Sequence, residues 1–160
     1  MFRGSVKILL LIFTAVLLQA CGSQDICDED NESLLVARFR TLADGNIVDT
    51  TLNVISIRGT RNGSDGLPFY SEVQAGRVIL PLNPSFEESC FIFSDMDLTD
   101  TLCIEYNMEA YLISEKCGFA GRYTLRKVRW TGTMINNVEI IDESVDAEYV
   151  IDEEHLWIYF

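Results

Sequence analysis

Cysteine is the residue type whose number and spacing say most about the chemistry of this chain. The 160-residue sequence has five cysteines and a single histidine, His155. No two cysteines form a C-x-x-C pair, so the ligand spacing of a zinc site is absent. The thiols could instead form disulfides, provided that the chain reaches an oxidising compartment.

The first twenty residues predict such export, because they have the pattern of a signal peptide. Arg3 and Lys7 precede an apolar run over residues 8–18. That run fits the apolar region of a signal peptide and is shorter than the roughly 18 apolar residues of a membrane-spanning helix. It ends in Leu-Gln-Ala-Cys21, which resembles the bacterial lipobox. We therefore predict a lipoprotein signal peptide over residues 1–20, with lipidation (palmitate) of Cys21; an ordinary signal peptide with a chance cysteine is the alternative.

Four cysteines remain once Cys21 carries the lipid: Cys27, Cys90, Cys103 and Cys117. An even number in an exported chain predicts two disulfides, and four thiols permit three connectivities. Free or metal-ligating thiols are the alternative.

Two alternating segments flank a predicted turn near residues 94–97 and would form a hairpin. In that register Cys90 lies opposite Cys103, which predicts a cross-strand disulfide and leaves Cys27 and Cys117, by difference, as the second pair. The other face of the hairpin would gather four apolar side chains: Phe91, Phe93, Leu102 and Ile104.

Acidic residues are the next group that could do chemistry. Asp95, Asp97 and Asp100 offer the oxygen ligands that calcium prefers, but the segment lacks the glycine and the distal glutamate of an EF-hand loop. A second cluster is equally unspecific: Asp142, Glu143, Asp146 and Glu148. Because turns are rich in aspartate in any case, we predict no metal site and no cofactor.

A catalytic triad would need a histidine positioned by an acid, and His155 is the sole candidate. It lies between Glu154 and Leu156 in the last predicted strand, where an exposed structural histidine is the simpler interpretation. A hydrolase that uses clustered acids would need two facing carboxylates in unlike environments. We therefore predict no catalytic residue and no enzymatic activity.

The charge of the chain limits its partners. The sequence has 12 basic and 25 acidic residues, a net charge of −13. Residues 1–20 contain two cations and no acid, so their removal leaves ten cations, 25 acids and a net charge of −15. Such an excess repels phosphate groups, which argues against nucleic acid as a partner.

The elements that must position these residues are strands. From Ser33 onward, apolar side chains recur with a period of two, and no window of eleven residues shows a helical stripe. Short strands separated by turn-forming segments predict an all-β, antiparallel β-sandwich (immunoglobulin-like or related) of eight to ten short strands, with a small barrel as the alternative. We expect an acidic tether over residues 21–32 and a single domain over residues 33–160.

Several short motifs resemble those of an uncharacterised family of small Bacteroidota lipoproteins, classed as a domain of unknown function. They are the lipobox, Ile26-Cys27, Arg38-Phe39, Leu80-Pro81-Leu82-Asn83, Tyr106-Asn107 and Cys117-Gly118-Phe119. The resemblance implies an envelope location and a Cys27–Cys117 pairing, with Cys90 and Cys103 as an additional pair. It implies no activity and no site residues.

The expected function is that of a non-enzymatic binding or assembly module, anchored to the outer membrane and facing the periplasm or the cell surface. Its partner would be an envelope protein or a glycan. The alternative is a lipocalin-like carrier of a small apolar ligand, although the G-x-W motif expected in a first lipocalin strand is missing. An enclosed apolar cavity would favour the carrier, whereas a filled core with exposed aromatic side chains would favour the binding module.

The anchor and both disulfides can be tested together by the intact mass of the protein extracted from membranes with detergent. We expect residues 1–20 to be absent and acyl chains to be present, with a gain of about four hydrogens on reduction. An unacylated mass would remove the predicted anchor, and four free thiols would remove the predicted disulfides.

Overall fold

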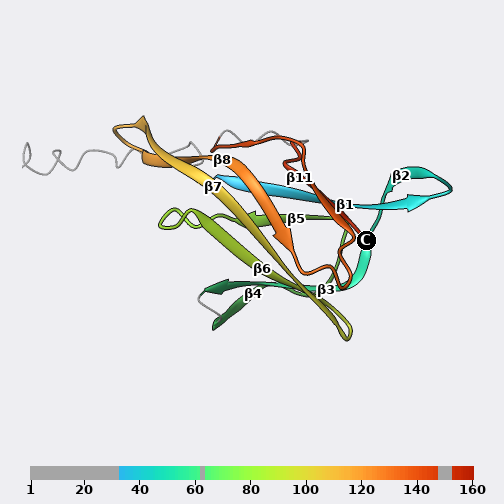
Figure 1. The fold of residues 1–160 in the computed structure, drawn as a ribbon. Coiled ribbons are helices and arrows are strands. Elements are labelled where there is room, and N and C mark those ends of the chain that lie inside the picture. The colour runs from blue at the N-terminus through green and yellow to red at the C-terminus, as the bar shows by residue number, and fades with distance from the viewer. Residues whose placement is uncertain (1–32, 62–63, 148–152) are drawn as a thin grey trace, which may run out of the picture.

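The structure is a computed structural model that describes residues 33–61, 64–147 and 153–160. The described chain folds into eleven strands in two sheets that face each other, and it contains no helix (Figure 1). The predicted all-β sandwich is confirmed. The described residues contain no helix long and apolar enough to cross a membrane. The predicted signal peptide and tether lie outside the described residues.

The smaller sheet is built around β1, which has neighbours on both sides. β11 pairs with β1 on one side and is followed by β9; β5 and β2 pair with successive parts of β1 on the other side. The bounds are β1 (Leu34–Ala43), β2 (Asn46–Asp49), β5 (Arg77–Pro81), β9 (Asn137–Ile140) and β11 (Leu156–Tyr159).

The larger sheet has the order β10-β8-β7-β6-β3-β4, and all of its pairings are antiparallel. Its strands are β3 (Leu52–Arg61), β4 (Ser64–Ala75), β6 (Glu88–Asp95), β7 (Leu98–Ser114), β8 (Gly118–Trp130) and β10 (Ser144–Val145). With 17 and 13 residues, β7 and β8 are longer than the short strands predicted. The two form an extended hairpin that projects beyond the sandwich (Figure 1).

The β6–β7 hairpin has the predicted register. Cys90 is paired with Cys103 across the two strands, and their sulfurs form a disulfide. Phe91 and Phe93 point to the opposite face of the hairpin and are almost completely buried. The prediction of this disulfide is therefore confirmed. The alternation of apolar residues was enough to predict the register, because only a two-residue turn separates the paired strands.

The space between the sheets is filled by apolar side chains that both sheets contribute. Alternation along each strand directs them inward, and many have no exposed surface. The fully buried set includes Leu35, Phe39, Ile55, Ile57, Leu80, Phe93, Leu102, Ile104, Tyr106, Leu156 and Ile158.

Among the described strands, one pair is parallel, and it joins the first strand, β1, to the last, β11. Ala37 to Arg40 of β1 lie beside Leu156 to Tyr159 of β11. This pair departs from the wholly antiparallel arrangement that we predicted. The backbone N–H of Phe160 extends the pairing by donating to the carbonyl of Arg40 at 3.0 Å.

His155 is buried, so the expectation of an exposed histidine was wrong. It is 1% exposed, and its Nδ1 accepts a hydrogen bond from the backbone N–H of Val36 at 3.0 Å. The backbone N–H of His155 donates to the carbonyl of Val36 at 2.9 Å. Burial lowers the pKa of His155, although Glu153 and Asp142 oppose this shift. The His155 side chain therefore holds the start of β11 against β1.

Asp100 is also buried. Its carboxylate holds the connection that runs from β8 in the larger sheet to β9 in the smaller sheet. The backbone N–H groups of Thr133, Met134 and Ile135 donate to it at 2.7–2.9 Å, and the hydroxyl of Thr131 donates as well. Burial alone would raise the pKa of Asp100, but these hydrogen bonds hold it well below its ordinary value.

Substitution of Asp100 by Asn should lower the free energy of unfolding by about 2 kcal/mol near neutral pH, because charge-assisted hydrogen bonds are lost. The pKa of Asp100 is lower in the folded protein than in the unfolded chain, where it is about 4. The stabilisation by the Asp100 charge is therefore fully present above about pH 4 and is lost as the pH falls below that value. Urea unfolding should show the difference from the wild type narrowing below about pH 4.

The matched control is Asp97→Asn, since Asp97 is exposed in the neighbouring turn. It should change stability by less than about 0.5 kcal/mol at any pH. A difference between Asp100→Asn and wild type that stayed constant down to pH 2 would contradict the assigned role of the charge.

Candidate functional site

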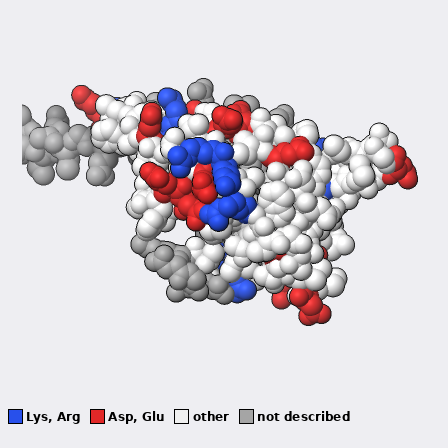
Figure 2. Space-filling model, in the orientation of Figure 1, with Lys and Arg blue, Asp and Glu red and all other residues white. Residues whose placement is uncertain are grey.

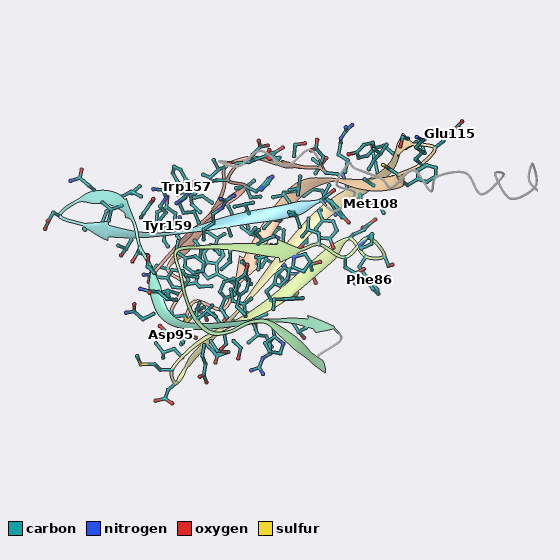
Figure 3. All side chains as sticks on the ribbon, turned by 180° about the vertical axis from the view of Figure 1, so that it is seen from behind. Phe86, Asp95, Met108, Glu115, Trp157 and Tyr159 are labelled. Carbon is teal, nitrogen blue, oxygen red and sulfur yellow. A yellow bond between two sulfur atoms is a disulfide. The ribbon has the colours of Figure 1, made fainter. Side chains whose placement is uncertain are left out.

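A groove of about 810 Å³ opens on the surface between the β3–β4 hairpin and the connection from β5 to β6. Phe69 of β4 and Phe86 of the connection line it and are 49% and 43% exposed. The buried Phe91 of β6 lies beneath them. Figure 3 shows Phe86 at the same end of the molecule as Glu115, with Asp95, Trp157 and Tyr159 toward the other end.

Gly59 explains the position of the Phe69 ring. A Cβ atom at Gly59 would lie 3.1 Å from Cε2 of Phe69, so the ring rests where a side chain would otherwise stand. The same ring lies 6.2 Å from that of Phe91, in a tilted arrangement. A glycine inside a strand often marks such a close approach. The composition of residues 59–66 is typical of a loop, but Gly59 is part of β3.

The opposite wall is held by Tyr106, which is fully buried in β7. Its hydroxyl donates to the carbonyl of Asn83 at 2.9 Å and accepts from the N–H of Asn83 at 3.0 Å. Ser89 Oγ lies 2.7 Å from the same hydroxyl. Burial raises the pKa of Tyr106, so the hydroxyl keeps its proton. These contacts fix the start of the connection that carries Phe86.

Charged side chains form the rim of the groove. Arg129 lies between Glu88 and Glu105 and forms ion pairs with both. Glu87 is 83% exposed, and its carboxylate lies 4.0 Å from the guanidinium of Arg126. A pair that long and that exposed contributes little stability. The Glu87 carboxylate is therefore available to another cation. Basic and acidic side chains are interspersed on the face seen in Figure 2.

The described residues contain one group close enough to resemble a metal site: Glu88, Cys90 and Cys103. Both sulfurs are joined in the disulfide, so neither can act as a thiolate ligand. The predicted cluster of Asp95, Asp97 and Asp100 does not converge, because Asp100 turns inward to the backbone of residues 133–135.

The second acidic cluster makes local contacts. Asp142 accepts a hydrogen bond from the backbone N–H of Ser144 at 2.9 Å, and Asp146 lies 3.9 Å from Arg122. Glu148 lies outside the described residues.

A separate charged cluster lies on the smaller sheet, where Glu154 accepts from Arg38, Arg40 and the indole N–H of Trp157. The guanidinium of Arg40 also lies 4.3 Å from the centre of the Trp157 ring. Burial alone would raise the pKa of Glu154, but Trp157 and the two arginines lower it. The cluster ties β1 to β11 and to Glu154 just before it.

The second predicted disulfide is described at one end only. Cys117 is disulfide-bonded, and the residue predicted as its partner, Cys27, lies outside the described residues, as does Cys21. The Cys27–Cys117 pairing and the lipidation of Cys21 remain predictions.

The fold and the groove together define a small β-sandwich protein with an open surface site. Residues 51–160 match the model of a family of unknown function, DUF6452, and the chain belongs to that family. The match covers β3 to β11 and so includes every residue of the groove described above. No curated protein and no solved structure matches the chain.

Substitution of Tyr106 by Phe should loosen the wall that carries Phe86. It removes the donor to the Asn83 carbonyl and should lower the free energy of unfolding by about 1–2 kcal/mol. Amide hydrogen exchange over residues 83–88 should accelerate more than exchange in the core of β7.

Tyr111→Phe is the control, because the Tyr111 ring is partly exposed and packs under Arg122. That ring contact survives the loss of the hydroxyl, so exchange at residues 83–88 should not change. Equal exchange rates in wild type and Tyr106→Phe would mean that other contacts hold this wall.

Proposed function

We propose that this protein is a lipid-anchored component of the bacterial envelope whose domain binds a partner protein and catalyses no reaction. The observation that carries the proposal is an open groove with two half-exposed phenylalanines on a sandwich whose interior is filled. Exposed aromatic surface beside a packed core is typical of an interaction site.

The anchor is supported by the sequence of residues 1–21. A basic start, a short apolar run and the Leu-Gln-Ala-Cys21 motif together favour acylation of Cys21 and export to the outer membrane. The disulfide between Cys90 and Cys103 is compatible with an oxidising compartment. The domain would then face the periplasm or the cell surface.

The groove favours an extended segment of a partner protein with one large apolar side chain. Phe69 and Phe86 could enclose that side chain, and Phe91 closes the base. Interfaces of this kind have an apolar centre with a polar rim, and one buried anchor residue supplies much of the affinity.

Charge favours a cation next to that anchor residue. Glu87 is highly exposed and weakly paired, and the predicted mature chain has a net charge of −15. A lysine or arginine of the partner would meet Glu87 at the rim and would be attracted to the protein as a whole.

The other two functions that the sequence left open have less support. A hydrolase would need an accessible histidine or a pair of free carboxylates, but His155 is buried and Glu88 and Glu105 share Arg129. A lipocalin-like carrier would need an enclosed apolar cavity, whereas the facing side chains of the two sheets fill the interior.

The proposal can be tested by NMR titration of the full mature protein with the synthetic peptide Lys-Phe-Lys-Leu-Lys. Amide shifts should appear at Gly59, Phe69 and Phe86. Phe86→Ala should weaken binding by about fivefold or more, which corresponds to about 1 kcal/mol. Met96→Ala should have no effect, since Met96 is 84% exposed in the distant β6–β7 turn.

Two further peptides separate the contributions of charge and apolar surface. Glu-Phe-Glu-Leu-Glu and Lys-Ser-Lys-Ser-Lys should each bind more weakly than the first peptide. Equal binding of all three, or shifts confined to other surfaces, would contradict a peptide site in the groove. Shifts at the same residues with an oligosaccharide, and none with the peptides, would replace the protein partner by a glycan.

A further inference from the structure

The tip of the β7–β8 hairpin exposes apolar side chains that the core does not use. Leu112 and Phe119 are register partners across the two strands and are 54% and 68% exposed. They continue the inward-facing row of Tyr106 and Met108 beyond the edge of the sandwich.

The chain enters the fold at this same hairpin. Ser33, just before β1, donates a hydrogen bond from its hydroxyl to the carbonyl of Gly121 in β8. Cys117, in the turn of the hairpin, is disulfide-bonded, and Cys27 is its predicted partner. Cys27 is six residues after the predicted lipid-bearing Cys21. Six extended residues span at most about 20 Å, so the pairing would hold the tip close to the anchor.

The charges at the tip also suit a lipid surface. Residues 111–119 contain one acid, Glu115, and one base, Lys116, so the tip has no net charge in a strongly acidic chain. At the base of this tip, the centre of the Tyr111 ring lies 4.8 Å from the guanidinium of Arg122. Tyrosine and arginine both favour the boundary between lipid headgroups and acyl chains.

From these observations we infer that Leu112 and Phe119 insert into the surface of the bilayer to which Cys21 is anchored, and so fix the orientation of the domain. The acidic chain repels anionic lipids, so the surface is one of zwitterionic headgroups. The inference rests on the anchor of the proposed function but does not depend on the ligand of the groove.

The exposed apolar residues at the other end of the molecule provide the comparison. Leu42 and Ile47 of the β1–β2 hairpin are 70% and 53% exposed, and β1 separates them from the end where the chain enters (Figure 1). Ten strand residues span about 33 Å. The Cys21 anchor therefore holds the β7–β8 tip close to the bilayer and does not hold the β1–β2 hairpin there.

The test uses the acylated full chain in phosphatidylcholine–phosphatidylethanolamine vesicles whose acyl chains carry bromine, which quenches tryptophan emission. The emission added by Phe119→Trp should fall by about half, because an inserted ring lies some 5–10 Å deep, near the brominated carbons. The emission added by Ile47→Trp should not change. Wild-type protein, with Trp130 and Trp157, supplies the background.

A second pair of variants tests the role of the disulfide. Cys27→Ser with Cys117→Ser, in the Phe119→Trp background, should lose most of the quenching, because the tip is then free to leave the surface. Unquenched emission from Phe119→Trp, or equal quenching at both hairpins, would overturn the inference while leaving the anchor intact. A mature mass without acyl chains would overturn both the inference and the anchor of the proposed function.

Discussion

The pairing of β1 with β11 is the constraint on which the smaller sheet depends. β1 buries Leu35, Val36, Ala37 and Phe39 completely, which requires neighbours on both of its sides. One neighbour is β5, and the other is supplied by the last residues of the chain. The bond from Val36 to His155 and the ion pairs of Glu154 flank this junction and fix its register. The hydrophobic layer is therefore complete only when both ends of the domain are in place.

Features that depend on neighbours close in sequence could be predicted, and those that depend on distant neighbours could not. The Cys90–Cys103 pair follows from alternation on either side of one turn. The burial of His155 and of Asp100 depends on partners that lie 119 and 31–35 residues away, which no local pattern reveals. In the groove, the composition around Gly59 is typical of a loop and so concealed that this glycine belongs to a strand. Phe69 and Phe86 gave no signal, because half-exposed aromatic residues are common on any surface.

The groove is a consequence of how the sandwich is closed at one end. Tyr106 reaches from the core to the backbone of Asn83, and Gly59 leaves room for the ring of Phe69. The same contacts that complete the packing therefore set the spacing between the two walls. A site built in this way is rigid at its base and adjustable at its rim, where the long side chains of Glu87 and Arg126 lie.

The central position of β1 also has a mechanical meaning. Tension that reaches Ser33 and is directed along the axis of β1 is carried by that strand. The hydrogen bonds to β5 and β11 cross that axis on both sides, so they are loaded in shear and must fail together. A strand at the edge of a sheet, pulled away sideways, would release its bonds one at a time. Tension along β1 is thus opposed by many hydrogen bonds at once.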